Sequence, residues 1–313
     1  MTDEKFSPLG TPGFPLAIAL LAQQVLGALT FPVARYGLRE IDPYTFAFFR
    51  FVISSLVLLF LARIRRSSPA IDKKDYRKIF LLGAIIIPFN QTTYLVGQSL
   101  TAAGHGALLF ATVPIWLFVA ALVFLKEKFV LRRGIGVAIG LLGVLLIMGG
   151  GAIEFSSRYL WGDLIILVSV LAWVSYTILG KPLVIKYGAL RVTAYALSFG
   201  TLLYLPFGLY RALSFDYTGV STGAWLSVLY VALGVSVVAY VLWYWLLKHL
   251  AASRLAVFNN IQPVIASLAA WVFLGEPVGL SFIIGGLVVL TGVLVTTAWG
   301  GRLFSRRNYG MQD

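Results

Sequence analysis

An apolar unit that occurs twice constrains the fold of this chain more than any other feature. Two apolar runs, Leu255–Leu274 and Val278–Thr297, are separated only by Gly275-Glu276-Pro277. Each run is about 20 residues long, which is the length of a helix that crosses the hydrocarbon core of a bilayer. The same pattern occurs 149 residues earlier in the chain. The matched pairs are Pro263 with Pro114, Glu276 with Glu127, Gly285 with Gly136, and Gly292 with Gly143. We therefore expect one structural unit used twice.

Apolar runs of this kind fill most of the chain, which has 313 residues, 59% of them hydrophobic and 12% charged. This composition excludes a water-soluble domain and predicts an all-α integral membrane protein with ten transmembrane helices. The predicted spans are residues 14–34, 44–62, 79–98, 105–125, 133–150, 160–180, 191–211, 223–247, 255–274 and 278–299. They group into a first five-helix repeat (14–150) and a second (159–300), with an N-terminal tail (1–13), a linker (151–158) and a basic C-terminal tail (301–313).

Short motifs at matching places give this pattern a family resemblance. An L-x-E sequence, a short break and a glycine-spaced helix occur in both halves, at Leu125–Glu127 and Leu274–Glu276. Further matching features are Asp42-Pro43 with Phe49-Arg50, and Gly162-Asp163 with Trp173. From about Leu16 to Trp299 the chain resembles the paired EamA repeat of the drug/metabolite transporter superfamily. Its overall sequence is most similar to the aromatic amino acid exporters of that superfamily. The resemblance implies two inverted repeats and export of amino acids, in particular tryptophan, phenylalanine and tyrosine, together with related metabolites or toxic compounds.

The net charge of +13 is distributed along the chain in a way that indicates membrane topology. Lys and Arg gather in every second break, which favours a membrane orientation over a nucleic-acid surface. Both termini are then cytoplasmic, in a multi-pass protein of the cell inner membrane. Because each half has five spans, the second half must be inverted relative to the first. The basic breaks hold Arg63 to Lys78, Lys126 to Arg133, Lys181 to Arg191, Lys248 to Arg254, and Arg302 to Arg307.

Inverted repeats place a substrate site at their interface near the middle of the bilayer, where polar side chains are costly unless they have a role. These side chains either line a transport pathway or form hydrogen bonds between helices, and we favour the pathway. Gln91, Tyr94 and Gln98 share one helix face. The predicted polar pathway residues are Gln23, Asn90, Gln91, Tyr94, Gln98, Asn259, Asn260 and Gln262.

Prolines and aromatic residues supply the remaining candidates. Pro114 and Pro263 should kink their helices, and Pro263 should free the carbonyl of Asn259. Aromatic residues near the middle of a span either stack on a substrate or fill helix contacts. The candidates of this type are Trp116, Trp173, Tyr176, Tyr240 and Trp243. Tyr244 and Trp245 lie close to Lys248 and are interpreted as interfacial residues.

Charged residues inside the spans are scarce. Arg50 is the only charge expected within a span, where it reaches outward, satisfies backbone carbonyls or binds a substrate carboxylate. All carboxylates are expected in termini, breaks or span ends, and no lysine within a span. We therefore expect facilitated transport without obligatory coupling through an intramembrane acid, no catalytic or metal-binding residues and no cofactor.

Partners follow from the same features. A small-molecule substrate and the lipid bilayer are expected partners, and nucleic acid is not. The glycines at positions 136, 140 and 143 form a stripe that favours packing within a monomer over a dimer contact. The alternative to an amino acid exporter is an efflux carrier for lipophilic cationic drugs, in which aromatic rings bind the cation.

Overall fold

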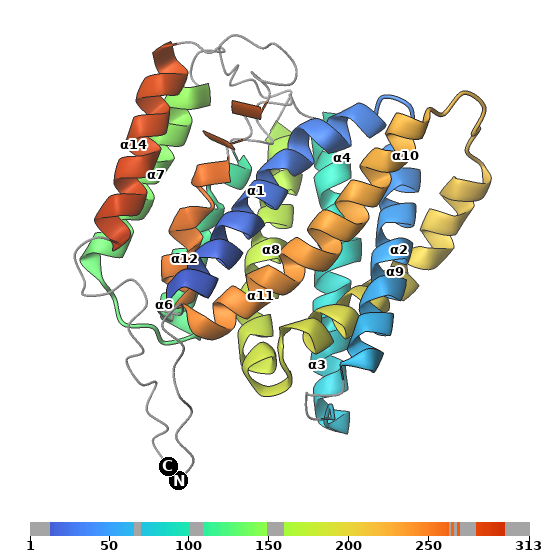
Figure 1. The fold of residues 1–313 in the computed structure, drawn as a ribbon, viewed down its shortest axis with the longest axis horizontal. Coiled ribbons are helices and arrows are strands. Elements are labelled where there is room, and N and C mark those ends of the chain that lie inside the picture. Colours follow the sequence, from blue (N-terminus) through green and yellow to red (C-terminus); the bar gives the residue numbers. More distant parts are fainter. Residues whose placement is uncertain are drawn as a thin grey trace.

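The computed structural model of the chain describes residues 13–65, 70–100, 109–148, 160–262 and 280–297, together with 264–265 and 268–269. In these ranges the chain is helical and contains no strand (Figure 1). The helices are α1 (Gly13–Gly37), α2 (Pro43–Ile64), α3 (Lys73–Ala84), η1 (Ile85–Gln91), α4 (Thr92–Leu100), α6 (Val113–Phe124), α7 (Leu131–Met148), α8 (Leu160–Tyr187), α9 (Ala189–Leu213), α10 (Thr222–Leu229), η3 (Tyr230–Ala239), α11 (Tyr240–His249), α12 (Ala252–Phe258) and α14 (Leu280–Thr297).

Local sequence explains several of these boundaries. Asp42 caps α2, because its Oδ1 accepts hydrogen bonds from the backbone N–H groups of Tyr44 at 3.1 Å and Thr45 at 3.3 Å, and Pro43 occupies the first turn. Gly188 separates α8 from α9 with a φ of 80°, a backbone conformation that only glycine adopts without strain. The two helices can therefore reverse direction at a single residue.

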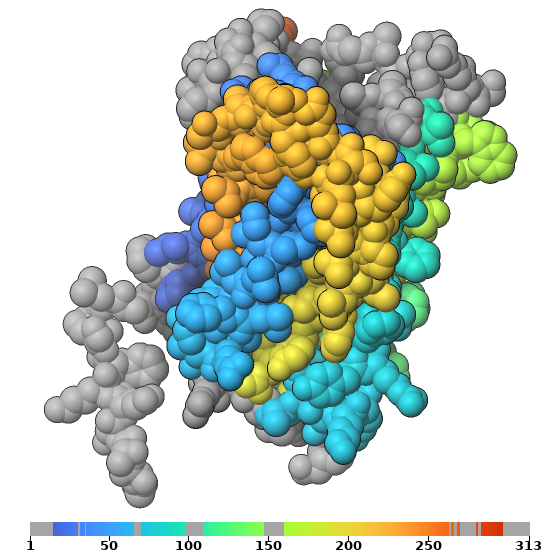
Figure 2. All heavy atoms as spheres, turned by 90° about the vertical axis from the view of Figure 1, so that its right-hand side faces the viewer, coloured from blue at the N-terminus to red at the C-terminus, as the bar shows by residue number. Residues whose placement is uncertain are grey.

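Five helices within the described residues are long and apolar enough to cross a membrane. They are Pro15–Ala34, Pro43–Ile64, Leu160–Tyr187, Ala189–Leu213 and Thr222–His249. The outer surface agrees with this assignment, since Leu56 and Phe60 on α2 and Leu202 on α9 are each more than 60% exposed. Figure 2 shows α2 beside α9 and the α10 region on one face of the molecule. A surface of this kind fits lipid rather than water.

Helices at matching places in the two halves pack against each other. In Figure 1, α7 runs beside α14, and α2 packs on α9 in the same way. The glycine stripe of α7 faces α14: a Cβ on Gly136 would lie 2.6 Å from the carbonyl oxygen of Gly292, and one on Gly143 would lie 2.7 Å from that of Gly285. The stripe therefore serves close packing within one chain.

Two long helices contain a π-helical segment. The residues of α3, η1 and α4 form one continuous helix, and η1 surrounds Pro88, whose missing N–H disturbs the regular α-helical hydrogen bonds. The same arrangement joins α10, η3 and α11 without a proline among the residues of η3. Such π-helical segments are frequent at functional sites, and η3 contributes to the site described below.

The predicted ninth span, residues 255–274, is interrupted early. Helix α12 ends at Phe258, and Asn259 and Asn260 form a turn. The Asn259 carbonyl is not freed as predicted, because it accepts a hydrogen bond from the N–H of Gln262 at 3.1 Å. Pro263 and the break Gly275-Glu276-Pro277 lie outside the described residues. The proposed inter-repeat linker, residues 151–158, lies outside them too.

The prediction that no lysine lies within a span is wrong. Helix α8 continues to Tyr187, seven residues beyond the predicted end of the sixth span, and contains Lys181. Lys181 is only 8% exposed. The span was expected to end at residue 180 because a charge follows, but this charge is neutralised by Glu127 inside the protein, at 3.2 Å. Arg50 is therefore not the only charged residue in a predicted membrane helix.

Candidate functional site

Five aromatic side chains from α8 and α11 form one cluster, called here the aromatic group. The ring of Trp173 lies 5.5 Å from that of Tyr240 and 5.9 Å from those of Tyr176 and Trp243, measured between centroids. The ring of Tyr176 stacks on Tyr244 at 4.8 Å. All five are buried except Trp173, which is half-buried. The structure therefore brings together four of the predicted aromatic candidates and adds Tyr244.

Two polar atoms of the aromatic group are bonded to the helix on which they pack, whereas the buried Tyr176 hydroxyl has no partner among the described residues. The Trp243 indole N–H donates to the Thr177 hydroxyl at 3.2 Å, and the Tyr244 hydroxyl donates to the Tyr176 carbonyl at 2.9 Å. Tyr244 is fully buried, so its interpretation as an interfacial residue is wrong. The distance to Lys248 along the sequence suggested an interface, but packing of α11 on α8 places the ring inside. Trp243 and Tyr244 thus hold the two helices together and support Trp173 and Tyr240.

Arg50 lies next to the aromatic group. Its position in α2 is about 10 Å from the start of that helix, at a rise of 1.5 Å per residue. Its Nε donates to the hydroxyl of Ser236 in η3 at 2.8 Å, and Tyr240 of the aromatic group follows Ser236 by one helical turn. The guanidinium carbon lies 4.8 Å from the centroid of the Phe51 ring. Ser236 in turn donates to the Val231 carbonyl at 3.3 Å, a five-residue step made possible by the π-helix. The guanidinium therefore neither reaches outward nor binds backbone carbonyls through this atom. It is held at a helix contact between α2 and η3, beside an aromatic ring.

A second set of polar side chains, called here the amide group, comes from α1 and from the residues that follow α12, with the Asn260 amide against Gly140 of α7. Its members are Gln23, Gln24, Asn259, Asn260 and Gln262. A Cβ on Gly27 of α1 would lie 2.7 Å from Nε2 of Gln262, so the two segments touch. Leu20, two turns before Gly27 on the same face of α1, packs in the cluster that contains Ile261 and Phe258.

Several amide atoms in this group are buried without a hydrogen-bond partner. Gln24 donates to Oε1 of Gln23 at 2.8 Å, but Oε1 of Gln24 has no partner. Oδ1 of Asn259 and Nδ2 of Asn260 also have none. Leaving such a group unpaired costs about 1–3 kcal/mol, so each one needs an explanation. A ligand with donors and acceptors of its own would satisfy them.

Asn90 is hydrogen-bonded to α8 through its side chain. Its Nδ2 donates to both the carbonyl and the hydroxyl of Ser169 on α8, at 2.8 and 3.0 Å, and the Ser169 hydroxyl donates to the Asn90 carbonyl at 2.9 Å. Its Oδ1 accepts from Gln91 at 2.9 Å. The amide is buried and fully used, which matches the alternative of interhelical hydrogen bonding.

The other candidates are placed as follows. Tyr94 is half-buried, with its ring 5.2 Å from that of Phe110. The side chain of Gln98 lies outside the described residues. Trp116 is 38% exposed, and its N–H donates at 3.1 Å to the hydroxyl of Thr112, the residue before α6. Pro114 stands at the start of α6, just after a break at Thr112, so the predicted interruption is present there.

Sequence reasoning missed Gln24 and Ser236. Gln24 adjoins a predicted residue, but it occupies a different helix face, the one shared with Leu20 and Gly27. Serine is common in membrane helices, so nothing in the sequence singles out Ser236. Among the described residues no three His, Cys, Asp or Glu side chains are grouped so that they could hold a metal ion.

Comparison with known proteins assigns the chain to a class. The model of the EamA-like transporter family matches residues 15–149 and 160–298. A transporter of Bacillus subtilis (strain 168), YdfC, which is described as uncharacterized, is 31% identical over 275 residues, covering 87% of each protein. A transporter of Archaeoglobus fulgidus, also described as uncharacterized, is 28% identical over 90% of this chain and 96% of its own.

Two further comparisons bear on substrate and fold. A probable terminal-alkyne amino-acid exporter of Streptantibioticus cattleyicolor is 27% identical over 88% of this chain and 91% of its own. A solved crystal structure superposes with a TM-score of 0.78 and covers 93% of this chain and 99% of that one. At 18% identity, this likeness concerns the fold alone.

Proposed function

Because the chain belongs to the EamA-like transporter family, we propose that it exports amino acids across the cell inner membrane, with tryptophan, phenylalanine and tyrosine as preferred substrates. The observation that carries this proposal is Arg50 beside the aromatic group. A cationic guanidinium binds a carboxylate, and aromatic faces bind an aromatic side chain. An aromatic amino acid presents both groups within one small molecule.

The amide group supports the same class of substrate. Its unpaired atoms include acceptors on Gln24 and Asn259 and a donor on Asn260, which suit the ammonium and carboxylate of a zwitterion. The resemblance to the aromatic amino acid exporters and the similarity to an amino-acid exporter of Streptantibioticus point the same way. The proposal therefore rests on chemistry and similarity together.

The architecture we propose is ten transmembrane helices in two inverted five-helix repeats, residues 14–150 and 159–300, with both termini cytoplasmic. The packing of α7 on α14 and of α2 on α9 supports it, because these are corresponding helices of the two repeats. Substrate would bind between the repeats, and rocking of one against the other would alternate access. One chain holds both repeats, so we propose a functional monomer.

Transport down the substrate gradient is part of the proposal. Every carboxylate in the described ranges lies in a break or within the first turn of a helix. None is placed like the mid-membrane acids of many proton-coupled carriers.

Export of lipophilic cations is the second candidate, since Trp173 and Tyr240 offer aromatic faces for cation–π contacts. Arg50 opposes it, because a fixed cation beside these rings repels another. Binding of labelled phenylalanine to the purified protein, with tyrosine or tetraphenylphosphonium as competitor, separates the two. We expect competition by tyrosine alone. Competition by tetraphenylphosphonium, or no saturable binding of phenylalanine, would overturn the amino acid assignment.

A further inference from the structure

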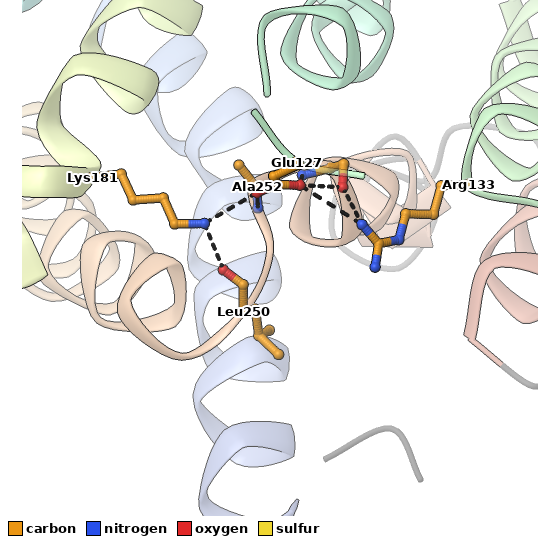
Figure 3. Close-up of polar contacts among 6 residues, drawn as sticks. Glu127, Arg133, Lys181, Leu250 and Ala252 are labelled. Carbon is orange, nitrogen blue, oxygen red and sulfur yellow. Dashed lines mark hydrogen bonds and ion pairs between the residues drawn. The ribbon is translucent and has the colours of Figure 1, made fainter. Parts of the chain in front are cut away.

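Glu127 makes a buried connection between the two halves of the chain. It follows α6 in the short segment before α7, and its side chain is only 6% exposed. Figure 3 shows its carboxylate directed at the turn between α11 and α12, residues 250–253, called here the α11–α12 corner. A residue of the first half of the chain thus binds the start of a helix in the second half.

Both carboxylate oxygens of Glu127 take part. Oε1 accepts from the N–H of Ala252 at 2.8 Å, and Oε2 accepts from the hydroxyl of Ser253 at 2.5 Å and from its N–H at 3.3 Å. These N–H groups belong to the first turn of α12, where no helical carbonyl is available to them. Arg133 of α7 adds a hydrogen bond from Nη1 to the Ser253 hydroxyl at 2.7 Å.

Lys181 of α8 holds the same corner from the other side. Its Nζ donates to Oε1 of Glu127 and to the Leu250 carbonyl, both at 3.2 Å (Figure 3). The corner is therefore fixed at Leu250, the residue after α11, and at the first residues of α12. Helix α12 leads directly to Asn259 and Asn260 of the amide group.

The buried charges of Glu127 and Lys181 favour two positions of the α11–α12 corner, one bonded to Glu127 and one fully separated from it. Burial alone raises the pKa of the Glu127 carboxyl, but the Lys181 ammonium and the bonds from Ser253 and Ala252 hold it below its ordinary value. Glu127 is thus ionised at neutral pH. If the α11–α12 corner moved away, the buried charges of Glu127 and Lys181 would lose hydrogen bonds. Buried charges of this kind require either their partners or water. An intermediate position without either is unfavourable.

We propose that Glu127 is a positioning residue of the transport cycle. It latches the α11–α12 corner to the first repeat, which sets the position of the amide group and keeps the basic face of the transporter closed. Opening that face requires the corner to leave Glu127. The inference rests on the alternating access proposed above and goes beyond it, because it assigns one conformational step to one contact.

The natural absence of cysteine makes a direct test simple. Spin labels are attached through Lys128→Cys and Lys248→Cys, two exposed positions beside the latch that take no part in it. Distances between the labels are measured in lipid nanodiscs without substrate. In an otherwise wild-type protein we expect mainly one short distance. In Glu127→Gln we expect a longer population, with the ratio of closed to open lowered about tenfold or more, because bonds to a charged group are lost.

Two further variants distinguish a latch from a merely structural contact. Glu127→Gln combined with Lys181→Met removes both charges of the 3.2 Å ion pair and leaves the partly exposed Arg133 without its contact to Glu127. It should therefore regain part of the lost thermal stability while the longer distance persists. Asp75→Asn is the matched control. Asp75 is a carboxylate with a 4% exposed side chain, bonded to Lys186 and Tyr187 away from the α11–α12 corner. We expect it to lose stability without a change in the distance.

An unchanged distance in Glu127→Gln overturns the latch, and so does a distance that returns to the wild-type value in the double variant. If the single variant does not fold, the double variant alone decides. Because no substrate is present, a failure of amino acid binding would refute the proposed function and leave this result intact.

Discussion

Replacing Arg50 should weaken substrate binding, whereas a control variant with a similar loss of stability should bind substrate normally. In Arg50→Gln the guanidinium is lost, together with the 2.8 Å bond from Nε to Ser236. A hydrogen bond to a charged group contributes about 1.5–3 kcal/mol. If one such bond joins Arg50 to the substrate carboxylate, the dissociation constant for phenylalanine should rise about 10- to 150-fold.

Ser236→Ala supplies the control, because it removes the same bond to Nε and leaves the guanidinium in place. Both variants should lose thermal stability, by about 1–3 kcal/mol for an unpaired buried polar group. Only Arg50→Gln should lose affinity in the labelled phenylalanine assay. Equal changes of affinity in the two variants, or unchanged affinity in both, would refute the assignment of Arg50 to the carboxylate.

Three further predictions follow from close contacts and from charge. Gly140→Ala places a Cβ 2.1 Å from Nδ2 of Asn260 and should lower substrate affinity up to about tenfold, whereas Gly134→Ala on the same helix meets only an ordinary contact at 3.7 Å and should bind normally. Asn90→Ala should lower the free energy of unfolding by about 1–3 kcal/mol and leave affinity unchanged, because its bonds join helices. Since the pKa of Glu127 is lowered by folding, its stabilising effect is present above the ordinary value of 4.5 and lost as the pH falls further, so the melting temperatures of wild type and Glu127→Gln should converge in acid.

Much of the helical framework follows from local sequence. Asp42 followed by Pro43 predicts the start of α2, because a carboxylate can accept from the first free N–H groups and proline needs no helical partner for its own nitrogen. Long apolar runs predict α2, α8 and α9, because a helix of this length and composition can cross a bilayer with its outward face against lipid.

What sequence reasoning could not supply is the identity of distant partners. Lys181 looked like the end of a span, because its neutralising partner Glu127 lies 54 residues away in the sequence. Tyr244 looked interfacial, because only tertiary packing on α8 shows that its ring is enclosed.

The candidate site could be predicted only in part, because its residues come from helices that are distant in the sequence. The aromatic group was anticipated from helix periodicity within α8 and within α11, but its contact with Arg50 depends on how α2 meets η3. Asn90 and Asn260 look alike in the sequence. Asn90 is fully bonded to α8, and Asn260 has an unpaired Nδ2, so only the structure separates a packing residue from a candidate ligand-binding residue.

The most direct test of the proposed transport is a flux measurement with the purified protein in liposomes. Labelled tryptophan is supplied outside and unlabelled tryptophan inside, with and without a pH gradient. We expect saturable uptake that excess phenylalanine suppresses and that the pH gradient leaves unchanged. Uptake no greater than in empty liposomes, from a preparation shown to contain folded protein, would contradict an aromatic amino acid exporter, and uptake that requires the gradient would contradict facilitated transport.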